Sequence, residues 1–354
     1  MRLFVLTILS VIGFIWPVMA VGINPVPVQS QRVELGNGTS KYNFAVYANL
    51  PINSTMGHIK NVVIIQHGLQ RNGSDFFSAG LKLMAANGIA ADKTLLIAPN
   101  FFTILDTASV ELHGIPIWKI MGWSSGEDAI NYPNRLSSFQ VFDDLLTLLS
   151  NKTHFPSLSS IVIVGYSEGG AMVQRYAALN KVHTRIRSAG VDLRYVIADS
   201  PSYLYFTKER PKGRNFIPYD STACINYNEY RYGMDKIIPY AADRTGQQVF
   251  TRYARRNVTY LLGSEDNDPN HRVLDKSCGA EAQGSNRLKR GIAYVHYERH
   301  LADGLNNLKR RAYEVDGVGH NYEALFGSKC GIAEIFNVPE DKIHTGAVCK
   351  EISY

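Results

Sequence analysis

The sequence predicts an α/β fold in which a mostly parallel sheet is covered by helices on both faces. Short runs rich in β-branched residues recur along the chain and are apolar throughout, as in strands buried on both faces. Segments with helical spacing of apolar residues lie between these runs, and such alternation is typical of parallel sheets. The 354 residues, 45% hydrophobic and 19% charged, are sufficient for one sizeable core.

The strands are expected in the following places. An early strand at residues 42–50 alternates apolar and other residues. The run at residues 61–66 is the clearest buried strand, and His67-Gly68 ends it. Similar runs occupy residues 94–98, 160–164, 195–198 and 258–262, with a weaker one at 312–315.

The helices are expected between these strands. Ser137 or Ser138 is a suitable N-cap for a helix through Leu149, and two further helices are expected at residues 168–181 and 287–307. The tract at residues 203–248 is long, aromatic-rich and weakly periodic, so we expect it to be a cap insertion over the carboxyl edge of the sheet. Residues 21–354 would then form a single α/β domain with this cap.

Residues 1–20 are expected to be a signal peptide. Arg2 supplies a basic start, an apolar run follows from Leu3 to Trp16, and Val18 and Ala20 suit positions −3 and −1 of a cleavage site. The alternative is a permanent membrane anchor, but the run is shorter than the ~20 residues that usually span a bilayer, and no basic cluster follows it. We therefore expect a secreted, periplasmic or extracellular protein without a stable membrane span after cleavage.

The charged residues give no indication of nucleic-acid binding. The formal net charge is +6, and basic clusters such as Lys309-Arg310-Arg311 are short and well separated. Solvated faces are the simpler interpretation of such clusters.

The four cysteines, Cys224, Cys278, Cys330 and Cys349, predict two disulfides, because an even count behind a signal peptide is typical of an oxidising compartment. Four cysteines allow three pairings. Their positions favour Cys224–Cys278, which would tie the insertion to a later loop, and Cys330–Cys349, which would hold the final segment. Their spacing fits no metal-binding pattern, so no metal site is expected.

The sharpest chemical signal is Gly165-Tyr166-Ser167-Glu168-Gly169. It directly follows a buried strand and directly precedes a helix, which is the context that a nucleophile elbow requires. The flanking glycines allow the tight turn, and the helix N-terminus favours developing negative charge. An ordinary turn is the alternative, but this placement favours Ser167 as a catalytic nucleophile.

A serine nucleophile needs a base and an acid, which in this arrangement follow it along the chain. His320 follows the predicted strand at 312–315 and a glycine-rich turn, so we expect it to be the base. Asp266 follows the strand at 258–262 and is the expected acid. Asp268 and Glu265 on the same loop, and Asp199 after the strand at 195–198, are the alternatives.

The tetrahedral intermediate of acyl transfer needs two backbone donors. The amide of Glu168, directly after the nucleophile, is expected to be one of them. The amide of Leu69, in the loop after the strand at 61–66, is expected to be the other, with Gly68 allowing close approach.

The ordered set His67-Gly68, Gly165 to Gly169, Gly263 to Asp266 and Gly319-His320 resembles the α/β-hydrolase superfamily over about residues 60–325. The resemblance implies an α/β-hydrolase fold. Many members of the superfamily have a neutral residue where this chain has Glu168, so a weaker field at the oxyanion site is expected. Further stretches resemble a subgroup of secreted hydrolases of unassigned substrate: Ser138-Phe139, Gln174-Arg175-Tyr176-Ala177, Asp266-Asn267-Asp268-Pro269-Asn270 and Gln283-Gly284.

These observations predict a secreted serine hydrolase that cleaves a small-molecule or polymer carboxylic ester and needs no metal or organic cofactor. A peptidase or amidase on the same triad is the alternative, with Arg210, Lys212 and Arg214 offering charge for a peptide terminus. A non-catalytic binding protein on this scaffold is a third interpretation. Tyrosines around the insertion either line a pocket or, as we expect, pack the cap.

Overall fold

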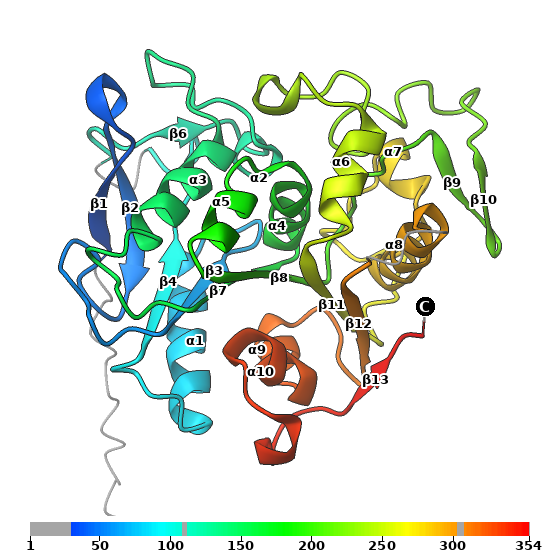
Figure 1. The fold of residues 1–354 in the computed structure, drawn as a ribbon. Coiled ribbons are helices and arrows are strands. Elements are labelled where there is room, and N and C mark those ends of the chain that lie inside the picture. The colour runs from blue at the N-terminus through cyan, green and yellow to red at the C-terminus, as the bar shows by residue number, and fades with distance from the viewer. Residues whose placement is uncertain (1–29, 108–111, 303–307, 354) are drawn as a thin grey trace, which may run out of the picture.

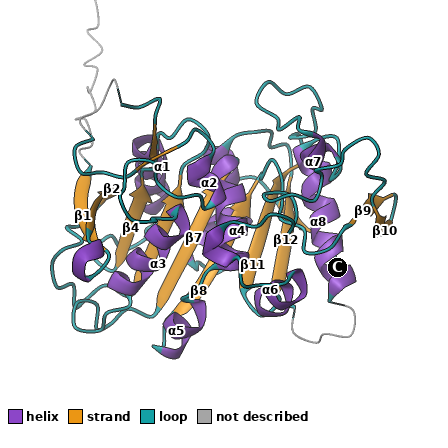
Figure 2. Ribbon diagram, turned by 90° about the horizontal axis from the view of Figure 1, so that it is seen from above, coloured by secondary structure: helices purple, strands orange, loops and turns teal. Residues whose placement is uncertain are grey.

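The computed structural model of the chain describes residues 30–107, 112–302 and 308–353, and the expected signal peptide at 1–20 lies outside them. The described residues form a nine-stranded sheet with helices on both faces (Figure 1), which confirms the predicted fold class. Viewed from above, the strands run side by side across the whole molecule (Figure 2).

The pairs from β4 to β12 are parallel, whereas β1, β2 and β13 pair antiparallel at the two edges. The strand order is β1 (Gln31–Leu35), β2 (Tyr42–Ala48), β4 (Thr94–Pro99), β3 (Asn61–Gln66), β7 (Ser160–Tyr166), β8 (Asp192–Ala198), β11 (Asn257–Gly263), β12 (Arg310–Val315) and β13 (Cys349–Glu351). Two small sheets join β5 (Phe102–Thr103) to β6 (Ile117–Trp118), and β9 (Glu209–Lys212) to β10 (Asn215–Pro218).

The apolar runs are buried on both faces because alternate side chains enter different cores. On one side, Val62 and Ile64 pack in a core with residues of α3 (Ser138–Leu149), α4 (Glu168–Leu179), α6 (Gly246–Tyr253) and α8 (Arg287–Leu301). On the other, Val63 and Ile65 pack with α1 (Gly73–Ala86), α9 (Tyr322–Phe326) and α10 (Lys329–Phe336), the group below the sheet in Figure 1. The shorter helices are α2 (Gly122–Ser125), α5 (His183–Ser188), α7 (Cys278–Glu281), η1 (Gly38–Ser40), η2 (Pro239–Ala241) and η3 (Glu340–Lys342).

The predicted strands and helices are present with small changes at their ends. Ser137 rather than Ser138 is the N-cap of α3, since its side chain accepts a hydrogen bond from the amide of Phe139. The helix expected at 168–181 ends at Leu179, and the one expected at 287–307 ends at Leu301.

Both predicted disulfides, Cys224–Cys278 and Cys330–Cys349, are present. The first joins the tract at residues 203–248 to α7, which follows the loop that carries Asp266. This tract contains β9, β10, η2 and the start of α6; its role as a cap stays a prediction. Among the described residues, no helix combines the length and apolar character needed to cross a membrane.

Candidate active site

Ser167 lies on the tight turn between β7 and α4. Its backbone has φ 54° and ψ −124°, a strained conformation for any residue other than glycine. Two neighbouring glycines permit the turn: a Cβ on Gly165 would collide with the carbonyl oxygen of Gly169, and a Cβ on Gly169 would collide with that of His67. Helix α4 begins at the next residue, so its positive end lies at the serine.

The structure brings Ser167, His320 and Asp266 together in one chain of hydrogen bonds. His320 Nε2 lies 3.1 Å from Ser167 Oγ, and His320 Nδ1 lies 2.7 Å from Asp266 Oδ2. Because an ionised carboxylate can only accept, Nδ1 carries the proton and Nε2 is left to accept from the serine hydroxyl. This is the arrangement that general-base activation of a serine requires.

Burial sets the ionisation of His320. The side chain is only 12% exposed, and burial lowers the pKa of His320 below the ordinary 6.5 against the opposing effect of Asp266. The positive charge of Arg287 lowers the same pKa further. A neutral imidazole, the form that accepts a proton, is therefore favoured around neutral pH.

Asp266 is held by two donors. His320 donates to Oδ2, and Arg287 Nη1 donates to Oδ1 over 3.1 Å, with both side chains of this ion pair almost completely buried. Burial alone would raise the pKa of Asp266, but the hydrogen bond and charge of His320, together with Arg287, hold this pKa below its ordinary value. The rivals Glu265 and Asp268 on the same loop are exposed.

Asp199, the remaining alternative for the acid, adjoins Asp266. It follows β8 with φ 41°, and its Oδ1 accepts a hydrogen bond of 2.9 Å from the amide of Gly263. One oxygen of Asp199, one of Asp266 and a ring nitrogen of His320 all lie within 4.8 Å of one another. Such donors can hold a metal, but the guanidinium of Arg287 already places a positive charge on Asp266.

The loop after β3 lies against the serine. A Cβ on Gly68 would come within 3.7 Å of Ser167 Cβ. Within the described chain, the expected oxyanion donors, the amides of Leu69 and Glu168, donate no hydrogen bond and so remain free for a ligand. His67 holds this loop: its Nδ1 donates to the carbonyl of Gly68, and its Nε2 accepts from the amide of Phe101.

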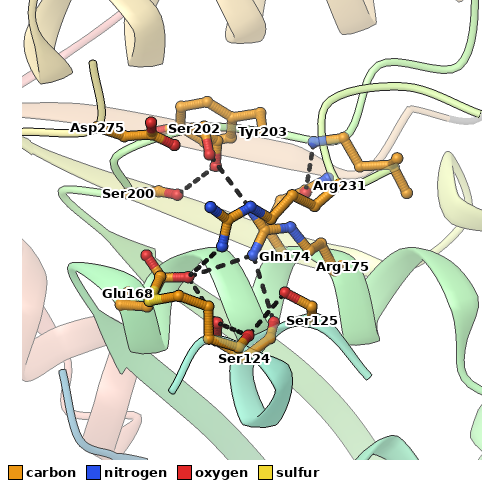
Figure 3. Close-up of polar contacts among 12 residues, drawn as sticks. Ser124, Ser125, Glu168, Gln174, Arg175, Ser200, Ser202, Tyr203, Arg231 and Asp275 are labelled. Atoms are coloured by element: carbon orange, nitrogen blue, oxygen red, sulfur yellow. Dashed lines mark hydrogen bonds and ion pairs between the residues drawn. The ribbon is translucent and has the colours of Figure 1, made fainter. Parts of the chain in front are cut away.

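The side chain of Glu168 belongs to a buried polar network beside the elbow (Figure 3). Its Oε1 accepts a 2.6 Å hydrogen bond from Ser124 and lies 3.5 Å from Arg175 and 3.9 Å from Arg231. Arg175 is fully buried and also donates to the hydroxyl of Ser202. From the sequence, we expected the negative charge of Glu168 to weaken the field at the oxyanion site. The two guanidinium groups offset this charge.

The tract at 203–248 reaches this network. Arg231, which lies 3.9 Å from Glu168, is a residue of this tract, and the hydroxyl of Tyr230 donates a hydrogen bond to the carbonyl of Ser125. Its aromatic residues pack as expected for internal side chains: Tyr203 stacks on Tyr294 of α8, and both are buried.

Arg210 cannot offer charge to a peptide terminus, contrary to one sequence-based interpretation. Its side chain is buried between the rings of Tyr205 and Tyr227 and donates to backbone carbonyls. Lys212 and Arg214, on the β9–β10 hairpin, remain exposed.

The sequence did not identify Arg287, Ser124, Arg175 or the ring of His67 as parts of the site. The seven-residue spacing of Glu168 and Arg175 on one helix was the only local signal, because it places both on the same face. Arg287 is 21 residues from Asp266, and Ser124 is 44 residues from Glu168, so their contacts depend on the tertiary fold.

Comparisons with known proteins indicate the fold. No protein-family model and no curated protein matches the chain. Among solved structures, LpqC, a poly(3-hydroxybutyrate) depolymerase from Bordetella parapertussis, superposes with a TM-score of 0.59 at 17% identity, over 86% of this chain and 90% of its own. Poly(aspartic acid) hydrolase-1 from Sphingomonas sp. KT-1 does so with a TM-score of 0.57 at 19% identity, over 84% of this chain and 96% of its own. With its mostly parallel sheet and strand-to-helix serine elbow, the chain has the fold of the α/β-hydrolase superfamily.

Proposed function

We propose that this protein is a serine hydrolase that cleaves carboxylic esters through an acyl-enzyme on Ser167. The observation that carries the proposal is the hydrogen-bonded series from Ser167 through His320 to Asp266, at 3.1 and 2.7 Å. These distances are within the reach needed for proton transfer and for orienting the base. Asp266 is the proposed acid because it, rather than Asp268 or Glu265, contacts His320.

In the proposed reaction, Ser167 Oγ attacks the ester carbonyl carbon while His320 Nε2 accepts its proton. The bond to the alcohol oxygen then breaks, and the imidazolium returns the proton to the leaving alcohol. Water attacks the acyl-enzyme, His320 again accepts a proton, and the carboxylic acid is released with Ser167 restored. Asp266 holds the Nδ1–H tautomer and stabilises the imidazolium.

The amides of Glu168 and Leu69 are the proposed oxyanion donors. Both are free of other hydrogen bonds in the described chain, and both lie next to Ser167, one by sequence and the other through the Gly68 contact. Backbone donors fixed in advance stabilise the tetrahedral oxyanion without reorganisation, which is commonly the largest contribution to such catalysis.

Ester rather than amide hydrolysis is proposed, although the fold alone accommodates both. The two similar structures carry the names of a poly(3-hydroxybutyrate) depolymerase and a poly(aspartic acid) hydrolase, so these names support a polymer ester and a polymer amide alike as substrate classes. The peptidase alternative loses support from Arg210, whose charge is buried. Secretion is proposed from the signal-like residues 1–20 together with the two disulfides.

The test combines labelling with turnover. A fluorophosphonate probe should modify the wild type at Ser167 and leave Ser167→Ala unmodified, because only an activated serine reacts. Short p-nitrophenyl esters should then be cleaved faster than peptide anilides. Absence of labelling at Ser167 would contradict the enzyme assignment, and faster cleavage of the anilides would replace the esterase with an amidase.

A further inference from the structure

Asp199 and Asp266 form a buried pair of carboxyl groups beneath the proposed triad. Asp199 is 1% exposed and Asp266 is 3% exposed. Asp199 Oδ1 accepts the amide of Gly263, but Oδ2 is buried and receives no hydrogen bond from any described donor. Gly263 lets this oxygen pack closely, since a Cβ there would lie 3.2 Å from it. A buried acceptor without a donor is costly unless the oxygen itself carries a proton.

The charges around Asp199 do not balance two ionised carboxylates. Asp266 follows β11, Arg287 begins α8, and His320 follows β12 with a pKa that burial lowers below the ordinary 6.5. The phenols of Tyr166 and Tyr203 also face Asp199, and burial raises the pKa of each further above the ordinary 10. Of the described groups facing Asp199, the single permanent cation, Arg287, is therefore shared by two acids.

The two acids receive very different hydrogen bonds, and this difference decides which of them is ionised. Asp266 accepts from His320 and from the guanidinium of Arg287, whereas Asp199 accepts from one neutral amide. Burial raises the pKa of Asp199 well above the usual aspartate range, and the charge of Asp266 raises it further. Charge-assisted hydrogen bonds favour the ionised form much more than one amide does.

We propose that Asp199 is a neutral carboxylic acid whose Oδ2 hydroxyl donates to the carboxylate of Asp266 and so positions the acid of the triad. The proton is the counter-charge that a second cation would otherwise supply. This role rests on the proposed function, but the protonation of Asp199 does not, and it can be measured separately.

The inferred hydrogen bond has a consequence for the base. A donor to Asp266 withdraws electron density from its carboxylate, so Asp266 stabilises the imidazolium of His320 less strongly. His320 consequently keeps a lower pKa and stays available as a neutral base. Removing the donor should raise the pKa of His320, whereas asparagine at position 199, with an amide donor of the same shape, should preserve it.

The first experiment measures protonation through stability. An acid whose pKa is raised by folding holds a proton that it loses on unfolding, so the contribution of Asp199 to stability decreases as pH rises above about 3.9, the value for an unfolded aspartate. Asp199→Asn removes this penalty and tolerates a positive φ. We expect the Tm of Asp199→Asn to exceed that of the wild type at about pH 8, with the difference shrinking towards about pH 4.

The matched control is Asp268→Asn, which removes an exposed carboxylate from the adjoining loop and should show no such pH-dependent gain. All buffers contain EDTA, so that a metal ion cannot replace the proton. An Asp199→Asn protein that is less stable than the wild type, or a Tm difference equal at both pH values, would overturn the protonation of Asp199.

The second experiment tests positioning through the pH dependence of kcat/KM. Asp199→Gly removes the carboxyl without straining a residue at positive φ. It should lower kcat/KM by about tenfold or more, the value of a hydrogen bond to a charged group, and move the acid limb of the profile to higher pH. Asp199→Asn should recover most of the rate and the original limb.

The outcomes separate the two proposals. If fluorophosphonate labels Ser167 in the wild type but Asp199→Gly leaves the acid limb in place, the positioning role is wrong and the proposed function stands. If the wild type is not labelled, the proposed function is wrong, and the thermal comparison still decides whether Asp199 is protonated.

Discussion

Two buried charge networks flank Ser167, and they are balanced in opposite ways. On the oxyanion side, the carboxylate of Glu168 lies 3.5 Å from Arg175 and 3.9 Å from Arg231, and Asp275 is a second acid near Arg231. On the acid side, the two carboxyl groups of Asp199 and Asp266 meet one guanidinium, Arg287. Glu168 therefore has two cations beside it, whereas Asp199 and Asp266 share one.

The difference suits what each side is proposed to do. Negative charge develops on the oxyanion side during acyl transfer, so guanidinium groups that offset the charge of Glu168 favour the transition state. On the acid side, a second cation would compete with His320 for Asp266, whereas a shared proton leaves Asp266 ionised and directed at the base. Charge can therefore be balanced by an arginine where it assists the reaction and by a proton where an arginine would interfere.

Removing the group between the two networks gives the largest expected effect. Ser167→Ala should lower esterase turnover by ~10³ or more, because no other residue replaces the nucleophile. It should leave the Tm nearly unchanged, since both networks stay intact. Activity is measured with a p-nitrophenyl ester on protein free of other hydrolases. Retention of more than about a tenth of wild-type activity would contradict the assignment of Ser167.

Charge removal on each side compares the two networks directly. Asp266→Asn should lower turnover by at least ~10², because the imidazole loses its orientation and the imidazolium its partner. Glu168→Gln should cost much less, because this side chain does not lie on the proton path. Rate measurements on both variants, with Asp268→Asn as the exposed control, decide the matter. If Asp266→Asn leaves turnover nearly unchanged while Asp268→Asn or Asp199→Asn lowers it severely, the acid has been misassigned.

The free energy of unfolding should show how strongly each arginine of the oxyanion-side network stabilises the fold. Arg175→Met leaves Glu168 buried with a weaker counter-charge and should reduce the free energy of unfolding by ~3 kcal/mol, typical of breaking a buried ion pair. Arg231 is 25% exposed and 3.9 Å from Glu168, so Arg231→Met is the matched control and should cost well under half as much. Denaturant unfolding measures both variants. Equal losses would mean that the two arginines share the role.

The strength of the apolar pattern in each segment explains which strands and helices could be predicted from the sequence. The central strands β3, β4, β7, β8 and β11 carry continuous apolar runs and were found from sequence. The edge strands β1 and β13 were not, because short strands with charged residues acquire their conformation from pairing with a neighbour. Helix α1 contains Gly73 and Gly80, which weaken any helical signal, and tight packing against Leu96 and Ile65 explains Gly80.

The site was predicted to a similar extent. Ser167, Asp266 and His320 follow strand ends in a fixed order, so the sequence predicted a triad, and the structure places these three side chains in hydrogen-bonding contact. The pairing of Asp199 with Asp266 was not predicted, because the sequence context showed the two residues only as alternative candidates for the acid of the triad. Only the adjacency of β8 and β11 in the sheet reveals that both carboxyl groups occupy the same site.

The smallest expected effect concerns the pH dependence of the wild type. Burial, followed by the charge of Arg287, holds the pKa of His320 below 6.5. The protonated imidazole cannot accept the proton of Ser167, so kcat/KM should fall as pH decreases through this pKa and be fully present above it. The acid limb should therefore lie below pH 6.5, as read from a kcat/KM profile with a neutral ester. An acid limb above pH ~7 would mean that Asp266 raises the pKa of His320 by more than burial and Arg287 lower it. The residues on the acid side would then stabilise the imidazolium in the resting state.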